Sequence, residues 1–500
     1  MSLTVAFADK TNYLELVGKL FESKFKIEKK IVLDDLDQLN NLMIDDVGIF
    51  IEFPYVDKHY RDSYYTYFST KHHLYSRDSI RLSFFQGKIE NNNFRINNEI
   101  DALKNNFLGF ITLRPTRINT IGRSVISPRL YKSNDFICCL AKYNVLINGV
   151  KLDVYGFPYC TQDGETLSCA ETTVLNIMEY FGVKYNNYTP TLPSKISNKL
   201  FERSFERLIP TNGLNTEDIS YALKELGFAT KIYHKDDFIK NTSHPFGFKE
   251  IVNSYIDSGI PIIATITNDY IGHAVIIIGH EILNDKTISL NKSGIPQAEY
   301  YSDYIDKYLI IDDNVTPYQL VLFDEPTNIL EYNHDESFKD CTIESVIVPL
   351  YHKVYVDSVL AHDLIRNILR EKLLINLSEP YIIKIFLTSS RSFKSETCIN
   401  SEFDPDIKEL IVSKKMPKFI WIAELYKDEN CMLQNNVMTL IVIDATEPNF
   451  DESHIIFIMH DNQYIVYNFS EKFYEKIYSE SIKISTFVNN LKEAHCQWQS

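Results

Sequence analysis

Four apolar residues in the middle of the chain recur with the spacing of one helical face. They are Val174, Ile177, Met178 and Phe181. Positions i, i+3, i+4 and i+7 lie on one side of a helix, so the pattern predicts a helix with a buried stripe. Ser168 and Glu171 have the spacing of a capping box, which places the first helical residue at Cys169. Gly182 is the expected end of this helix.

The segments that follow alternate between helical spacing and short apolar runs. Asn215 or Thr216 is expected to cap a second helix, which Gly227 should end. Apolar runs without helical spacing predict buried strands. These strands span residues 262–266, 273–279 and 307–311.

The two flanking regions also mix helical and strand patterns. The N-terminal region predicts strands at 47–53, 80–85 and 107–113 and a helix at 57–68, with Arg123 beyond the last strand lacking an obvious partner. The C-terminal region predicts a helix at 356–371, a polar loop at 389–392, a final helix starting at 473–478, and five strands. The strands are 381–387, 419–425, 437–443, 455–458 and 464–467. We expect an α+β protein with an N-terminal α+β domain (1–135), a central domain (136–325) and a C-terminal α/β domain (340–500).

Composition narrows the kinds of partner and the compartment. The 500 residues are 45% hydrophobic and 24% charged, which is typical of globular domains with substantial cores. The net charge of −16 disfavours nonspecific binding to nucleic acid or to anionic membranes. The sequence shows no transmembrane run and no signal peptide, and its eight cysteines do not form a disulfide-type pattern. We therefore expect a cytoplasmic protein that binds neither nucleic acid nor membranes.

Cys169 is the strongest candidate for a reactive side chain. At the first residue of a helix, a thiol lies beside unsatisfied backbone N–H groups and the positive end of the helix dipole, and both favour the thiolate. Most cysteines are inert core residues, so the position alone is weak support. Gln162 upstream, His273 at the start of an apolar strand, and Asp312-Asp313 at the end of a later strand complete a Cys–His–Asp order.

Three neighbouring residues compete for the role of orienting His273. Asp312 is preferred because strand side chains alternate, so that Asp312 facing His273 would make Asp313 point away. Asn314 would share the face of Asp312, and an amide can also hold an imidazole. Asp313 and Asn314 therefore remain reserve candidates.

Residues of about 155–320 resemble the C39-like branch of the papain-like cysteine peptidases. The resemblance rests on Gln162 ahead of Ser168-Cys169-Ala170, the segment from Gly213 to Gly227, Gly272-His273-Ala274-Val275 and Asp312. Gln162 lies seven positions before Cys169, one more than is usual in that family. The whole arrangement is similar to that of uncharacterised bacterial multidomain proteins with such a core.

The resemblance implies a thiol hydrolase that acts on an amide bond in a peptide or protein substrate. It implies Cys169 as nucleophile, His273 as base and acid, Asp312 as orienter, and Gln162 in the oxyanion hole. Acyl transfer through the same triad, or a catalytically silent binding or scaffold module, are the alternatives. We expect no cofactor and no metal, because zinc-protease and P-loop motifs are missing from the sequence. Residues 340–500 are expected to contribute no catalytic side chain, and Cys160, His244 and His280 are weaker candidates.

Overall fold

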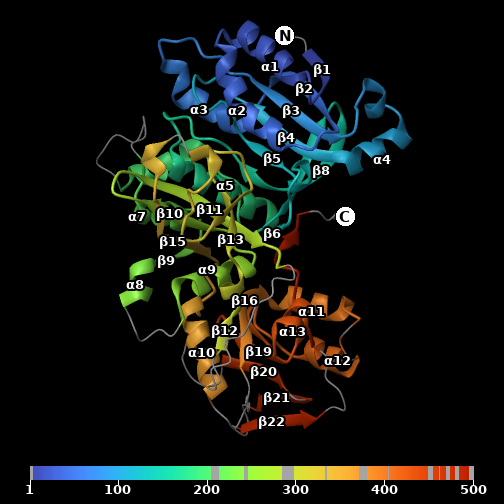
Figure 1. The fold of residues 1–500 in the computed structure, drawn as a ribbon, viewed down its shortest axis with the longest axis vertical. Helices are drawn as coiled ribbons and strands as arrows, with labels where there is room; N and C mark the ends of the chain where they lie inside the picture. The colour runs from blue at the N-terminus through green and yellow to red at the C-terminus, as the bar shows by residue number, and fades with distance from the viewer. Residues whose placement is uncertain are drawn as a thin grey trace.

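The protein has a mixed α and β fold in which three large sheets follow one another along the long axis (Figure 1). The structure is a computed structural model. It describes residues 4–203, 213–240, 246–283, 298–332, 335–370, 380–401, 403, 405–448, 454–460, 462–468, 473–478 and 484–494.

The first sheet lies at the N-terminal end and has the order β1-β2-β3-β4-β5-β8-β7. Its strands are β1 (Thr4–Asp9), β2 (Val47–Tyr55), β3 (Ser79–Gln86), β4 (Phe107–Leu113), β5 (Ser124–Ile126), β7 (Ala141–Ile147) and β8 (Val150–Tyr159). The accompanying helices are α1 (Tyr13–Phe25), α2 (Lys29–Leu42), α3 (Lys58–Thr66) and α4 (Asn97–Asn106). All neighbours in this sheet pair antiparallel, and the tight turn between β7 and β8 makes these two strands a hairpin.

The second sheet forms the middle of the molecule and has the order β14-β13-β11-β10-β15-β9. Its strands are β9 (Ala229–His234), β10 (Ile262–Thr267), β11 (Gly272–Glu281), β13 (Lys307–Ile311), β14 (Gln319–Leu322) and β15 (Thr342–Leu350). Two short strands, β6 (Phe136–Cys138) and β24 (Lys492–Glu493), extend this sheet. Strand β6 pairs with β11, and β24 pairs with β6. The helices are α5 (Cys169–Lys184), α6 (Pro193–Phe201), α7 (Thr216–Glu225), α8 (Lys235–Lys240) and α9 (Phe248–Asp257).

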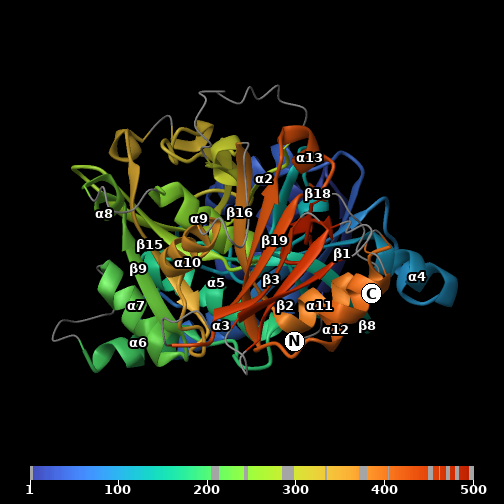
Figure 2. The same cartoon turned by 90° about the horizontal axis from the view of Figure 1, so that it is seen from below.

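The third sheet lies at the opposite end of the long axis (Figure 1), and β16 and β19 are seen from that end in Figure 2. Its order is β12-β16-β17-β19-β20-β21-β22. Its strands are β12 (Ala298–Tyr300), β16 (Tyr381–Ser389), β17 (Phe419–Tyr426), β19 (Thr439–Asp444), β20 (Ile455–His460), β21 (Gln463–Asn468) and β22 (Phe473–Tyr478). The helices are α10 (Ser358–Arg370), α11 (Ser390–Ile399), α12 (Pro405–Ser413) and α13 (Glu429–Leu433), and a separate pair joins β18 (Asn436–Val437) to β23 (Ile484–Ser485). No helix within the described ranges has both the length and the apolar character needed to cross a membrane.

The strands do not group by the residue ranges that composition and pattern predict. The hairpin β7–β8 joins the first sheet although it lies after residue 135, and β15 joins the second sheet although it lies after residue 340. The chain therefore crosses between sheets where its sequence gives no break. The division into 1–135, 136–325 and 340–500 stays a prediction about which parts fold together.

Two expectations for the C-terminal region are wrong. The segment Phe473–Tyr478 is a strand rather than a helix, because its backbone pairs with β21 along all six residues. The polar stretch after β16 is the start of α11 rather than a loop. The side chain of Ser389 accepts a hydrogen bond from the backbone N of Ser392 at 3.1 Å and so caps the helix. The polar residues of this stretch led to the prediction of a loop.

Helix α5 lies between the first and second sheets and is buried nearly all round. It contacts β7 and β8 on one side and β11 on the other. It begins at Cys169 as predicted, but it continues through Gly182 to Lys184. The glycine serves close packing instead of ending the helix, since a Cβ at Gly182 would lie 2.4 Å from the backbone N of Pro190.

Arg123 connects the first sheet to α5. Its guanidinium donates two hydrogen bonds to Oε1 of Glu179, at 2.9 and 2.6 Å, and the Glu179 side chain is only 3% exposed. Burial by itself would raise the pKa of Glu179, but Arg123, His59 and Lys58 lower it to about 2. The carboxylate is therefore ionised, and its neighbours hold it in place at the centre of the molecule.

We expect Arg123→Ala to lower the free energy of unfolding by about 3–5 kcal/mol, because it leaves a buried carboxylate without its main partner. A folded-state pKa below the usual value contributes stability above pH 4.5 that is lost as the pH falls toward 2, so the difference should shrink in acid. Thermal unfolding against pH is the measurement. Lys104→Ala is the control, since it removes only an exposed ion pair with Asp101. Equal losses in the two variants would contradict the prediction.

Candidate active site

The turn before α5 fixes the position of Cys169. The carboxylate of Asp163 accepts hydrogen bonds from the backbone N of Glu165, Thr166 and Leu167, at 2.9, 2.6 and 2.9 Å. Three backbone bonds to one buried side chain hold the loop in one conformation. The capping box that the sequence predicts follows directly, because Glu171 accepts from the backbone N of Ser168 at 3.1 Å.

Cys169, His273 and Asp312 come together from three elements. His273 lies at the start of β11, and Asp312 directly follows β13, the antiparallel neighbour of β11. The imidazole Nε2 donates to Oδ1 of Asp312 at 2.8 Å. The Cys169 thiol at the start of α5 lies beside the same imidazole and contributes to raising its pKa. Since Asp312 occupies Nε2, the other ring nitrogen, Nδ1, is left for the thiol.

Further contacts hold Asp312 and His273 in place. Tyr332 donates its hydroxyl to Oδ2 of Asp312 at 2.5 Å, and the backbone N of Asn314 donates to Oδ1 at 3.0 Å. The ring of Phe338 stacks on the ring of Tyr332. It also meets the imidazole of His273 edge-on, and the centroids of these two rings are 5.5 Å apart. Both oxygens of Asp312 are therefore satisfied, and the imidazole is packed against an aromatic side chain.

The loop that follows Asp312 is tied to the first sheet. Tyr159 of β8 donates its hydroxyl to the backbone O of Val315 at 2.7 Å. Tyr318 donates to the backbone O of Ile126 at 2.7 Å and accepts from the backbone N of Phe157 at 2.8 Å. The N-terminal strands thus position one side of the candidate site.

The charges in this group support one another. Burial lowers the pKa of His273, but the Asp312 carboxylate, the Cys169 thiol and Asp313 together raise it well above its usual value. Burial likewise acts to raise the pKa of Asp312, and the charge and hydrogen bond of His273 bring it below its usual value. The pair is therefore an imidazolium and a carboxylate at neutral pH.

Strand alternation predicts that the side chain of Asp313 points away from the site. In the structure it lies at the site instead. Its side chain is buried and its Oδ1 lies 3.6 Å from Nε2 of His273. Strand β13 ends at Ile311, so the alternation of side chains no longer applies two residues later. Asp312 is nevertheless the nearer carboxylate and makes the hydrogen bond.

The side chain of Gln162 is hydrogen-bonded to Asn314, the third candidate for orienting His273. Its Nε2 donates to Oδ1 of Asn314 at 2.6 Å. Asn314 in turn lies against the hydroxyl of Tyr332, at 3.5 Å from Nδ2. Asn314 therefore supports Gln162 and Asp312, and the imidazole is held by the carboxylate.

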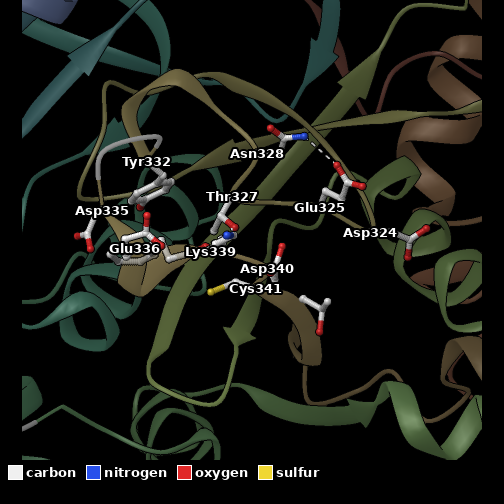
Figure 3. A pocket seen from close by; sticks show the side chains of 12 residues that line it. Asp324, Glu325, Thr327, Asn328, Tyr332, Asp335, Glu336, Lys339, Asp340 and Cys341 are labelled. Carbon is white, nitrogen blue, oxygen red and sulfur yellow. Dashed lines mark hydrogen bonds between the residues drawn. The ribbon is translucent and has the colours of Figure 1, made fainter.

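A cavity of about 580 Å³ adjoins this group (Figure 3). Two of its lining residues, Tyr332 and Phe338, are the ones that contact Asp312 and His273. In Figure 3, Tyr332, Asp335 and Glu336 lie on one side, while Asp324 lies on the other. The lining has an excess of carboxylates over its one lysine, Lys339.

The donor atoms of His273, Asp312 and Asp313 all lie within 4.8 Å of one another, a spacing that would also suit a metal ion. We interpret them as a proton-handling group, because Nε2 of His273 and Oδ1 of Asp312 already satisfy each other at 2.8 Å. The backbone and Tyr332 take the remaining positions on Asp312.

No protein-family model matches this chain, and no curated protein matches its sequence. The geometry of the described residues therefore carries the functional argument.

The weaker candidates from the sequence do not join this group. Cys160 is fully buried, its Sγ lies 3.6 Å from Oδ1 of Asn176, and burial raises its thiol pKa to about 12. His280 lies further along β11, where its Nε2 meets Asp257 at 3.3 Å. His244 lies outside the described residues.

Sequence reasoning missed Asp163, Tyr332 and Phe338. The Asp163-Gly164 pair is a turn signal, so its role in fixing the loop was accessible from the sequence. Tyr332 and Phe338 have no such signal. They lie 20 and 26 residues beyond Asp312, and only the chain path after β14 brings Tyr332 to Asp312 and Phe338 to His273.

Proposed function

We propose that the protein is a papain-like cysteine hydrolase that cleaves an amide bond in a peptide or protein. The observation that supports this most is the placement of Cys169 beside His273, whose imidazole is hydrogen-bonded to Asp312, with Asp312 held by Tyr332 and Asn314. A helix-start thiol, an imidazole with a raised pKa and a buried carboxylate form the set that nucleophilic acyl chemistry needs.

The first half of the reaction forms a thioester. The Cys169 thiolate attacks the carbonyl carbon of the substrate, and the carbonyl electron pair moves to oxygen. When the tetrahedral intermediate collapses, the C–N bond breaks and the His273 imidazolium gives its proton to the leaving amine. The acyl group is then carried on Sγ, and His273 is neutral.

The second half returns the enzyme to its starting state. His273 takes a proton from water, whose oxygen attacks the thioester carbon. The C–S bond breaks, the acid leaves, and the thiolate–imidazolium pair is restored. Throughout both halves Asp312 keeps the N–H at Nε2, so that Nδ1 faces the reacting atoms.

Gln162 and the backbone N–H of Cys169 are proposed to stabilise the oxyanion. An amide NH₂ has two hydrogens, and the bond to Asn314 uses one of them. That bond orients the side chain and leaves the second hydrogen to donate to developing negative charge.

Intact-mass analysis with iodoacetamide tests the proposal first. Wild type should take up one label fast, and Cys169→Ala should not. Cys398→Ala is the matched control, because that cysteine is exposed and belongs to α11, outside the candidate site. A peptide library then tests turnover. It should include peptides with lysine or arginine, given the carboxylates of the adjoining cavity. Amide products formed only with an added amine would indicate acyl transfer, and labelling without any product would indicate a silent scaffold.

Asp312→Ala should lower the turnover rate at least tenfold, because the imidazole loses the partner that sets its tautomer and its charge. Asp313→Ala should be milder, since its carboxylate is 3.6 Å from Nε2 and makes no hydrogen bond there. Turnover of the two variants under saturating substrate is the measurement. The reverse order would move the orienting role to Asp313.

A further inference from the structure

Asp313 is a buried carboxylate that the reaction above does not use. Its residue is 3% exposed, and neither side-chain oxygen has a hydrogen-bond partner within the part of the chain that the structure describes. The Thr172 hydroxyl lies close enough to lower the pKa of Asp313, but it donates to the backbone O of Ser168 at 2.7 Å. A buried carboxylate without donors is costly in its ionised form.

The charge around Asp313 is unbalanced. Asp312 and His273 already form a hydrogen-bonded pair, so an ionised Asp313 would place a second negative charge 3.6 Å from one imidazolium. Burial, reinforced by Asp312 and opposed by His273, raises the pKa of Asp313 to about 7.

Several other titratable groups face Asp313 from the elements packed around it. Besides Asp312 and His273, they are Tyr159 and Cys160 at the end of β8, and Tyr332. Burial raises the pKa values of these two tyrosines and of Cys160 above the neutral range. At neutral pH the three are therefore uncharged, and they can neither balance an ionised Asp313 nor compete with it for a proton.

We propose that Asp313 is a second carboxylate partner of His273, a positioning residue that holds an exchangeable proton beside the candidate catalytic pair. When protonated, it relieves the excess negative charge of the group. When it ionises, its charge stabilises the imidazolium, so that His273 keeps its proton to higher pH. The effect on turnover rests on the proposed function, whereas the stored proton itself does not.

Asp313→Asn is the direct test, because asparagine has nearly the same shape but cannot ionise. In the variant, the alkaline limb of kcat/KM should move to lower pH by about one unit, since one of the charges that holds the imidazolium is gone. A purely structural role would lower the rate at every pH and leave the limb in place. Glu336→Gln is the matched control, because it removes an exposed carboxylate from the adjoining cavity.

Thermal unfolding gives a readout that needs no substrate. A carboxyl whose pKa is higher in the folded state makes the protein less stable as the pH rises from about 4 to about 7. The melting temperature of Asp313→Asn relative to that of wild type should therefore rise by about 2 °C or more between about pH 4 and pH 7. This result would stand even if the protein proved to have no hydrolase activity.

Infrared difference spectra of wild type, acid against alkaline, give a check that does not depend on the variant folding. They should show a buried protonated carboxyl that disappears as the pH rises through about 7. Absence of that signal would overturn the proposal. Coinciding pH profiles of wild type and Asp313→Asn, or an equal shift in Glu336→Gln, would overturn it as well.

Discussion

Cys169→Ala should abolish turnover of any peptide that the wild-type protein cleaves, with a loss of at least about 1,000-fold. The nucleophile is removed, and no neighbouring group in the described site can replace it, because Cys160 is buried and protonated. Alanine suits the start of a helix, and Cys169 is only partly buried, so we expect a stability cost of no more than about 1–2 kcal/mol. Product formation by mass spectrometry and the melting temperature are the two measurements.

Cys160→Ala is the matched control for this variant. It removes a thiol nine positions upstream that is fully buried against Asn176, so it should cost stability and keep turnover. Turnover that persists in pure Cys169→Ala, or that disappears only in Cys160→Ala, would contradict the assignment of the nucleophile.

His273→Gln should slow both turnover and the alkylation of Cys169. In the proposed mechanism the imidazolium stabilises negative charge on the neighbouring sulfur, and Asp312 keeps that imidazolium charged at neutral pH. Without it, we expect alkylation near pH 7 to slow by about tenfold or more, and turnover to fall by at least about 1,000-fold. Glutamine keeps much of the volume of the side chain and has no basic nitrogen.

His280→Gln is the control on the same strand. His280 is fully buried and pairs with Asp257, away from Cys169, so its loss should affect stability and leave the alkylation rate unchanged. If the two variants slowed alkylation equally, the effect would come from a general disturbance of β11. If neither slowed it, the thiolate of Cys169 would not depend on His273.

The proposed roles differ in how much each depends on the N-terminal sheet. Cys169 is placed by a turn and a helix that are adjacent in sequence. The loop that carries Asp312 to Asn314 is held by two hydrogen bonds to the first sheet. Tyr159 of the sheet donates to the backbone of the loop, and Tyr318 of the loop donates to the backbone of the sheet. The flanking strands therefore contribute to the geometry of the candidate site as well as to the size of the molecule.

Local patterns determined much of what the sequence revealed. The capping box of Ser168 and Glu171 specifies where α5 begins, because both hydrogen bonds join residues three positions apart. Apolar runs predicted β10, β11 and β13, because a strand that is buried on both faces has consecutive apolar residues, which is again a local pattern. The helix start, the strand ends and the Cys–His–Asp order, together with the family resemblance, predicted Cys169, His273 and Asp312, and the fold brings these three residues together.

Tertiary structure decided the features that depend on distant partners. Phe473–Tyr478 is a strand because its backbone pairs with β21. The position of Gly182 inside α5 is explained by the close approach of Pro190, which leaves no room for a Cβ. The same holds within the candidate site. The pairing of Ile276 with Ile311 brings the end of β13 beside His273, and the chain's turn there buries Asp313 as well. Tyr332 reaches Asp312 across 20 residues. Such contacts depend on strand register and on the chain's path in space, and neither quantity is encoded in the spacing of neighbouring residues.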